Sequence, residues 1–269
     1  MNGWRLELRQ APALRVDLRG VTLTALAALS SAQVGQLRVG HGNTTVPLAE
    51  FFRVGPGPDD TLHFAGDLAR FDRVGWQMSA GRIVVDGSAG HYAGGCMSGG
   101  ELRIGADAGL LAACEMSGGS LRIGGDVGDF AAGTLPGSMD GMRGGTLVVA
   151  GRAGARLGDR MRRGSVVVFG DAGDFVASRM VAGTIAIGGT AGAHVGYGMR
   201  RGSVVLASSA PEPPSTFVPA IAPANVFWQL LARDLARHGG VFADLPARRI
   251  ERHLGDLSAG GKGELVLVS

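Results

Sequence analysis

A repeat of 19 residues restricts the fold of this chain more than any other feature of the sequence. Seven methionines mark it, at residues 78, 97, 116, 142, 161, 180 and 199. Five of the intervals are 19 residues and one is 26. A glycine lies three residues after each methionine, and two apolar residues follow at alternating positions, as in Leu147 and Val149. A tandem array of this period indicates a stacked repeat architecture.

Each repeat predicts one short strand and leaves no room for a helix. The alternating apolar pair describes a strand with one face turned inward, and the glycines supply corners with positive φ. When such units stack, each strand pairs in parallel with its equivalent one coil away, at a rise of about 4.8 Å. The period is not the six residues of a left-handed hexapeptide helix. The predicted fold is therefore mainly β: a right-handed parallel β-helix (a solenoid) of about seven 19-residue coils.

The two ends of the array are expected to be covered by different structure. We predict an N-terminal α+β cap over residues 1–60, the glycine-repeat β-helix over 61–207, and a linker with a helical tail over 208–269. In the cap, residues 4–8 and 14–18 alternate and predict a hairpin, and residues 23–29 predict a helix.

The tail begins with a proline-rich linker at residues 211–214, followed by predicted helices at 223–238 and 246–254 and a strand at 264–268. The apolar side of the first helix is expected to contain Phe227, Leu230, Leu231 and Leu235. This tail either caps the last coil or docks on a partner. The single longer interval is a seven-residue insertion within residues 133–140, which predicts a loop on a contact face.

The sequence offers no catalytic residue and no metal ligand. The six histidines have no metal-binding spacing, and Cys96 and Cys114 are interpreted as small core or turn residues. Residues 255–262 lack the phosphate-loop pattern before Lys262 and predict a tight turn. The methionine column is expected to fill the core, since a thioether packs adaptably.

Composition bounds the environment in which the chain works. Two cysteines cannot form a disulfide scaffold, and the first twenty residues lack the apolar core of a signal peptide. The longest apolar run, residues 21–32, is too short to span a bilayer. We therefore expect a soluble, cytoplasmic protein.

Charge is distributed unevenly along the array. Residues 78–141 contain three arginines and seven acidic residues, whereas residues 142–202 contain nine arginines and three aspartates. Several arginines share registers beside the methionine column and should form one ridge. This arginine ridge comprises Arg143, Arg160, Arg162, Arg163, Arg179, Arg200 and Arg201. It is either a solvated basic surface or a docking site for an acidic partner subunit or a polyanionic ligand. The net charge of +3 and the few aromatic residues argue against nucleic acid.

The motif at residues 142–154, Met-Arg-Gly-Gly-Thr-Leu-Val-Val-Ala-Gly-Arg-Ala-Gly, resembles the glycine-repeat β-helix of the glutamate synthase C-terminal domain. It is still more similar to the C subunit of formylmethanofuran dehydrogenase. The resemblance extends to about residue 207 and includes the alternating N-terminal segment and a degenerate coil at residues 59–67.

This resemblance implies membership of an enzyme complex whose chemistry resides on other subunits. One branch is the archaeal molybdenum or tungsten enzyme that reduces CO2 to formylmethanofuran. The other is the formyltransferase/hydrolase complex of methylotrophic bacteria. That complex transfers a formyl group from formyl-tetrahydromethanopterin to a methanofuran-type carrier and releases formate. The 26 basic residues include a single lysine, which favours a GC-rich bacterium and hence the second branch.

The resemblance further implies formyltransferase-like and amidohydrolase-like partner chains in an obligate hetero-oligomer, with zinc on the amidohydrolase-like subunit. The present chain would be a scaffold without an active site. Because methanofuran-type carriers bear glutamate tails, we hypothesise that the arginine ridge holds such a tail. The alternatives are the archaeal dehydrogenase subunit, a glutamate-synthase-like structural subunit, and a free-standing enzyme with a site in the groove.

Overall fold

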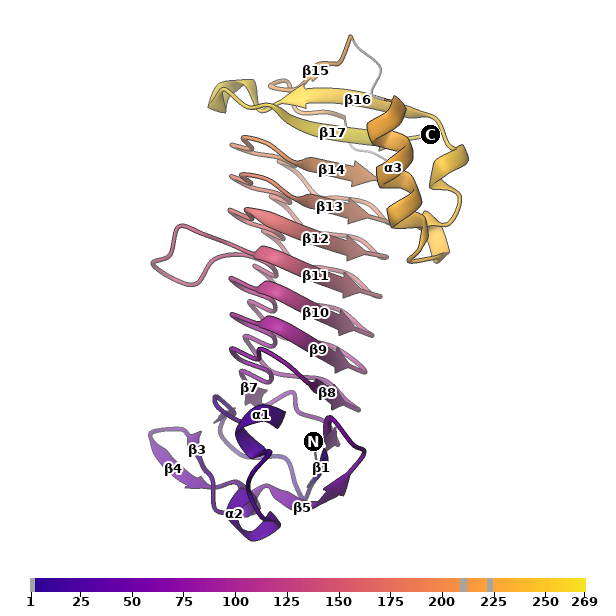
Figure 1. The fold of residues 1–269 in the computed structure, drawn as a ribbon. Coiled ribbons are helices and arrows are strands. Elements are labelled where there is room, and N and C mark those ends of the chain that lie inside the picture. The colour runs from indigo at the N-terminus through magenta and orange to yellow at the C-terminus, as the bar shows by residue number, and fades with distance from the viewer. Residues whose placement is uncertain (1–2, 209–211, 222–224) are drawn as a thin grey trace.

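The chain is mainly β and is built around one large sheet. The computed structural model describes residues 3–208, 212–221 and 225–269. Thirteen strands form the large sheet, in the order β15-β16-β17-β14-β13-β12-β11-β10-β9-β8-β6-β1-β5. Its repeat strands are β8 (Arg82–Val85), β9 (Ser98–Ile104), β10 (Ser117–Ile123), β11 (Arg143–Val149), β12 (Arg163–Val168), β13 (Thr184–Ile187) and β14 (Ser203–Leu206). They stack along the molecule (Figure 1).

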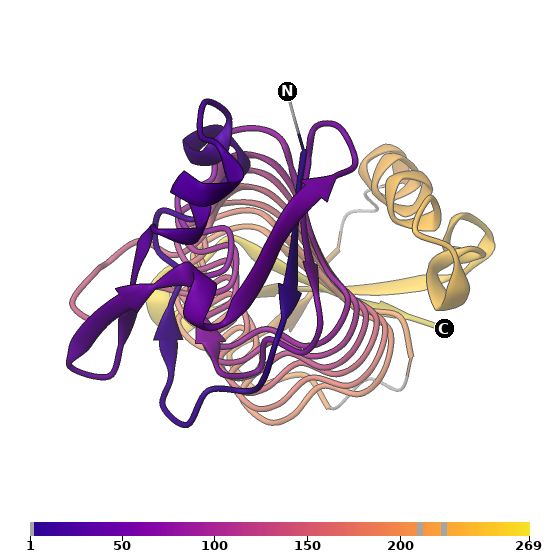
Figure 2. The same ribbon diagram turned by 90° about the horizontal axis from the view of Figure 1, so that it is seen from below.

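Repeat strands pair in parallel with their equivalents one repeat away, as the period predicts. Leu147 of β11 lies opposite Leu121 of β10 and Val166 of β12. A second line of isolated parallel bridges joins successive repeats, from Leu68 to Ala191. Seen along the stack, the successive coils nearly superimpose (Figure 2). The expectation of a mainly β chain with stacked parallel strands is confirmed.

The methionine column lies inside the stack, as predicted. All seven repeat methionines are at most 1% exposed. Their side chains explain why glycine follows three residues later. Gly145 has φ +85°, and a Cβ there would lie 2.7 Å from Met116 Cε of the preceding coil and 2.7 Å from the Gly119 carbonyl oxygen. No other residue fits this close approach between coils.

Each coil also has a corner where residues other than glycine adopt positive φ. In one coil these are Phe175 (φ 62°), Ala177 (φ 59°) and Arg179 (φ 53°). This conformation costs about 1–2 kcal/mol per residue. Hydrogen bonds between coils offset that cost, since the N–H of Arg179 donates to Tyr197 at 2.7 Å and that of Phe175 donates to Ala193 at 2.8 Å.

In the N-terminal part, the predicted hairpin is wrong. Strand β1 (Gly3–Leu8) pairs with β5 (Phe52–Gly57) and β6 (Thr61–Ala65) in the large sheet. Strand β2 (Val16–Asp17) belongs to a second sheet of order β4-β3-β2-β7. The other strands there are β3 (Arg38–His41), β4 (Thr44–Pro47) and β7 (Phe71–Asp72). Burial of β1 against distant strands therefore outweighs the local turn.

The predicted helix at residues 23–29 is shorter than expected. Helix α1 covers Leu23–Leu26, and α2 covers Ser31–Gly35. The segment is divided because Ser30 begins a new helix through a capping box with Gln33. A short 3-10 turn, Leu48–Glu50, then leads into β5.

The C-terminal segment caps the end of the array. Strand β17 (Gly263–Val268) adds in parallel to β14, which confirms the predicted final strand, and β16 (Ile250–Gly255) pairs antiparallel with β17. A short β15 (Val218–Pro219) pairs with β16. The predicted second helix at residues 246–254 is wrong, because β16 is needed to cover the edge of β17. Only a 3-10 turn, Leu245–Ala247, precedes β16, and another, Gly240–Phe242, follows α3.

Helix α3 (Asn225–Ala236) lies beside the large sheet (Figure 1). The predicted start of this helix at Pro223 and the first linker proline, Pro211, lie outside the described residues. The predicted apolar side is partly wrong: Leu235 is buried and Leu231 partly buried, but Phe227 is 43% and Leu230 64% exposed.

Trp228, Ala232 and Leu235 of α3 instead pack on Val167 and Val205, which face out of the sheet. Two earlier coils place exposed arginines, Arg103 and Arg122, at this position, whereas the coils from Val148 onward offer a helix a continuous apolar surface. No helix among the described residues is both long and apolar enough to cross a membrane.

Candidate anion-binding ridge

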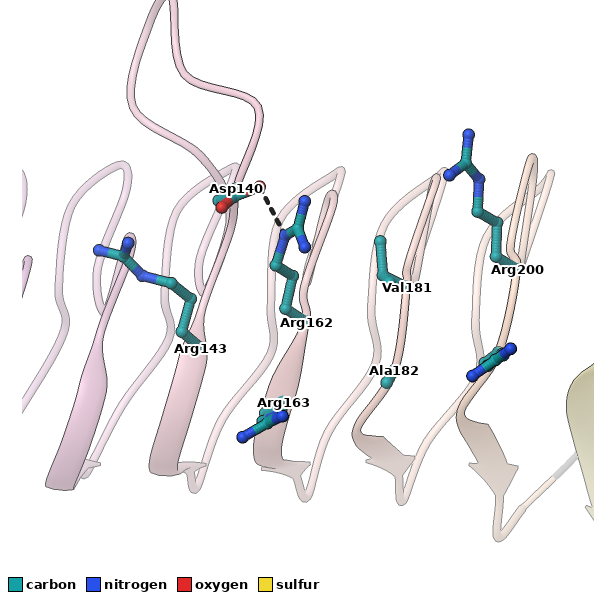
Figure 3. A pocket seen from close by; sticks show the side chains of 8 residues that line it. Asp140, Arg143, Arg162, Arg163, Val181, Ala182 and Arg200 are labelled. Carbon is teal, nitrogen blue, oxygen red and sulfur yellow. Dashed lines mark hydrogen bonds and ion pairs between the residues drawn. The ribbon is translucent and has the colours of Figure 1, made fainter.

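All seven arginines of the predicted ridge come together on one side of the array. A groove with a volume of about 650 Å³ is lined by Asp140, Arg143, Arg162, Arg163, Val181, Ala182, Arg200 and Arg201 (Figure 3). A smaller groove of about 280 Å³ adjoins it and adds Arg160 and Arg179. Arg162, Val181 and Arg200 line both, so the two grooves form one continuous surface.

The repeat geometry sets the spacing of the ridge. The residue after each methionine donates its N–H to the methionine one coil earlier: Arg162 to Met142 and Arg200 to Met180, both at 2.8 Å. Because the methionine points into the core, its neighbour in the chain points outward. Equivalent side chains therefore repeat with the coil rise of about 4.8 Å.

One coil interrupts the ridge. Val181 and Ala182 occupy the positions that Arg162 and Arg163 hold in the coil before and that Arg200 and Arg201 hold in the coil after (Figure 3). The two arginine pairs are thus two coils apart, or about 10 Å. Val181 and Ala182 therefore form a small apolar surface between the two arginine pairs.

Three ridge arginines have acidic partners. Arg162 Nε donates to Asp140 Oδ1 at 2.5 Å, Arg143 lies 3.7 Å from Glu115, and Arg160 lies 3.7 Å from Asp159. The remaining four are Arg163, Arg179, Arg200 and Arg201. Among residues 3–208, 212–221 and 225–269, no carboxylate oxygen is within 4.0 Å of their guanidinium groups. The ridge therefore carries uncompensated positive charge, which favours an anionic ligand.

The seven-residue insertion forms a loop between β10 and β11, as predicted, and it projects from the stack (Figure 1). Its end reaches the ridge, which the sequence did not reveal. Met139 is 66% exposed and its Sδ lies 3.0 Å from Arg160 Nη1, while Asp140 holds Arg162. The loop therefore forms one wall of the groove.

Both cysteines occupy structural positions, in agreement with their interpretation as core or turn residues. Burial raises the pKa of the Cys114 thiol to about 12 and also raises that of the half-buried Cys96. Residues 255–262 form the predicted turn, between β16 and β17, with a 3-10 segment at Leu257–Ala259. Within the described part of the chain, no three His, Cys, Asp or Glu side chains group closely enough to hold a metal ion.

The fold and the ridge together define a β-stranded repeat protein with an arginine-lined groove. No family model matches the chain. A solved structure, the formyltransferase/hydrolase complex FhcABCD of Methylorubrum extorquens with methylofuran, contains a similar chain. The two are 40% identical with a TM-score of 0.92, over 98% of this chain and 99% of that chain.

Sequence comparison finds relatives over a shorter stretch. The C subunit of the formyltransferase/hydrolase complex Fhc of Methylorubrum extorquens is 43% identical over 85 residues, which is 32% of each protein. The C subunit of the molybdenum-containing formylmethanofuran dehydrogenase 1 of Methanosarcina barkeri is 37% identical over 87 residues, 30% of this chain and 29% of that one. These alignments span about a third of each curated relative. The chain belongs to the family of C subunits of formyltransferase/hydrolase and formylmethanofuran dehydrogenase complexes.

Proposed function

We propose that this chain is the non-catalytic scaffold subunit of a cytoplasmic formyltransferase/hydrolase complex, and that its arginine ridge holds the glutamate tail of a methanofuran-type carrier. The complex would transfer a formyl group from formyl-tetrahydromethanopterin to the carrier and release formate. The reacting groups would lie on formyltransferase-like and amidohydrolase-like subunits, the latter with zinc. A structural role is supported by the burial of the seven repeat methionines and of Cys114 in packing positions.

The scaffold we propose is a right-handed parallel β-helix over residues 61–207, between an α+β cap (1–60) and a tail (208–269). Two parallel ladders support it: the pairs among the repeat strands and the line of bridges from Leu68 to Ala191. Strand β6 begins at Thr61 and β14 ends at Leu206, close to the boundaries of the repeat array.

One observation carries the ligand assignment: all seven predicted arginines line one surface, and four have no carboxylate partner among the described residues. The pair of Arg162 with Asp140 illustrates the contact that a glutamate tail would make. On a half-exposed surface such charge-assisted contacts contribute about 0.2–1 kcal/mol each, so a tail would need several of them. The relative from Methylorubrum extorquens was solved with methylofuran, a carrier of the proposed class.

The test replaces Arg162, Arg163, Arg200 and Arg201 together with alanine in the assembled complex. We expect the carrier to be released while the subunits stay associated, measured by mass spectrometry of the purified complex. A matched control replaces four exposed arginines off the ridge, Arg9, Arg53, Arg122 and Arg233. Unchanged carrier content in the ridge variant would show that the ridge is only a solvated basic surface.

A second candidate is the molybdenum or tungsten formylmethanofuran dehydrogenase, favoured by the 37% identity to the C subunit from Methanosarcina barkeri. A native pull-down of this chain separates the two. Formyltransferase-like and amidohydrolase-like partners without iron–sulfur proteins support the hydrolase complex. Molybdenum or tungsten with iron–sulfur partners supports the dehydrogenase, whereas amidotransferase partners would support a glutamate-synthase-like subunit.

A further inference from the structure

The last strand of the chain adds one more row to the ridge side of the array. β17 pairs in parallel with β14, and Glu264 lies opposite Ser203. The N–H of Glu264 donates to Gly202 at 2.9 Å, just as the N–H of Ser203 donates to Gly183 at 3.0 Å. β17 therefore occupies the place of a further repeat, although no methionine precedes it at the repeat spacing.

In this added row, Lys262 takes the register of Arg201. It lies two residues before Glu264, as Arg201 lies two residues before the paired Ser203. Its backbone N–H donates to the Arg200 carbonyl at 2.7 Å, which fixes it against the ridge. Lys262 is exposed and is the only lysine of the chain.

The positions in register with Lys262 hold cationic side chains only in the coils near the C-terminal end of the array. Equivalent positions in the earlier coils hold small residues, such as Gly118 and Gly144, and later ones hold Arg163, Ala182 and Arg201. Equivalent residues in register point to the same side of a sheet. The positive charge of the ridge therefore continues onto the hairpin formed by β16 and β17.

The two carboxylates nearest to Lys262 in the sequence, those of Asp256 and Glu264, are already engaged elsewhere. Asp256 is buried and accepts hydrogen bonds from Gly198 N–H at 2.9 Å and from the Ser258 N–H and hydroxyl at 2.9 and 2.7 Å. Glu264 pairs with Arg252 at 2.5 Å. In the portion of the chain that the structure describes, no carboxylate oxygen lies within 4.0 Å of the charged nitrogens of Arg200, Arg201 or Lys262.

We propose that Arg200, Arg201 and Lys262 form a carboxylate-binding station at the C-terminal end of the ridge, which holds one carboxylate group of the carrier's glutamate tail. This inference rests on the proposed function of the ridge. Arg201 and Lys262 are held in rows about 4.8 Å apart, so their charges repel until an anion lies between them. Arginine supplies a planar fork of donors and lysine a compact charge, a combination that suits one carboxylate. At the other end, Asp140 already occupies Arg162.

The experiment measures binding of a fluorescein-labelled hexaglutamate peptide to the full chain by fluorescence anisotropy. We expect K262Q to weaken binding at least threefold and K262R to restore it. The matched control R9Q removes an exposed positive charge at the opposite end of the chain and should leave binding unchanged. Melting temperatures of all variants establish that the fold is intact. Binding by K262Q equal to that of the unaltered chain would overturn the station.

A double-mutant cycle tests whether the residues share one carboxylate. If they do, R201Q and K262Q together should weaken binding by less than the product of the single effects. Strictly multiplicative effects would mean separate contacts and would refute the shared station. The four-arginine ridge variant separates the two proposals: if it loses the peptide while K262Q does not, the ridge stands and the station fails. If it binds normally, the proposed function itself fails.

Discussion

Replacing Gly145 with alanine places a methyl group between two coils of the array. Two effects add. At φ +85°, an alanine costs about 1–2 kcal/mol in backbone energy alone. The new Cβ also lies 2.7 Å from both Met116 Cε and the Gly119 carbonyl oxygen. Overpacking of this kind costs about 1–3 kcal/mol more. We expect G145A to lose about 2–5 kcal/mol of unfolding free energy.

A matched glycine isolates the contact between coils. Gly20 has φ +84°, and a Cβ there would meet no atom within 4 Å. G20A should therefore lose only the backbone contribution, about 1–2 kcal/mol. The assay is urea unfolding of both variants, followed by circular dichroism. Equal losses in the two variants would refute the steric argument.

A second substitution tests whether the Met116 side chain or the Gly119 backbone excludes a Cβ at position 145. Shortening Met116 removes the side-chain part of the clash, but the Gly119 carbonyl remains equally close to the new Cβ. Because M116A removes a buried side chain and is itself destabilising, the comparison is made within the M116A background. G145A should destabilise M116A by nearly as much as it destabilises the unaltered chain. A much smaller loss in the M116A background would mean that only the methionine side chain, and not the backbone of the neighbouring coil, requires glycine here.

Three further predictions concern the ridge, the thiols and the C-terminal helix. D140N should strengthen hexaglutamate binding about two- to fivefold, because it removes a carboxylate that competes for the ridge; anisotropy measures this. Iodoacetamide at pH 8 should alkylate Cys96 before Cys114, whose raised pKa of about 12 leaves almost no thiolate until the pH rises towards that value; mass spectrometry of peptides follows this. W228A should detach α3, at a cost of about 3–5 kcal/mol, and expose it to proteolysis, whereas F227A should not.

Each of these predictions has a result that would contradict it. For the first, E7Q is the control: it removes a more exposed ion pair, with Arg53 in the N-terminal part, and should not change peptide binding. If D140N weakens binding instead, Asp140 orients the ridge rather than competing for it. Faster alkylation of Cys114 than of Cys96 would mean that its coil opens readily. Equal proteolysis of the two α3 variants would mean that Trp228 is not the residue that holds the helix on the sheet.

The features that the sequence predicted are those that recur in every repeat. Met142 and Gly145 each satisfy a packing requirement that recurs in every coil. Their spacing alone therefore predicts the strand positions, the buried methionine column and the register of the arginines. Which side of α3 packs on the sheet could not be predicted in this way. It depends on Val167 and Val205 holding an outward position that arginines occupy in two earlier coils, a pattern visible in the sequence only once the helix is known to lie there.

Pairings across long sequence distances were beyond prediction for a similar reason. The partners of β1 are β5 and β6, selected by burial rather than by a local turn. The insertion was located correctly, but its direction depends on the contact of Asp140 with Arg162, which a spacing argument cannot supply. The sequence predicts only a turn at Lys262, because its register is defined by pairing with a strand about sixty residues earlier.

The rigid spacing of the ridge determines how its charges act together. At physiological ionic strength, charges interact over about 8 Å. Neighbouring rows about 4.8 Å apart lie within this distance, whereas the two arginine pairs that flank Val181, about 10 Å apart, lie beyond it. A bound anion therefore relieves repulsion within Arg200, Arg201 and Lys262 but gains little from Arg162. The glutamate tail that we propose would therefore occupy the ridge as a series of separate stations, and a tail with several carboxylates would gain affinity by occupying more than one.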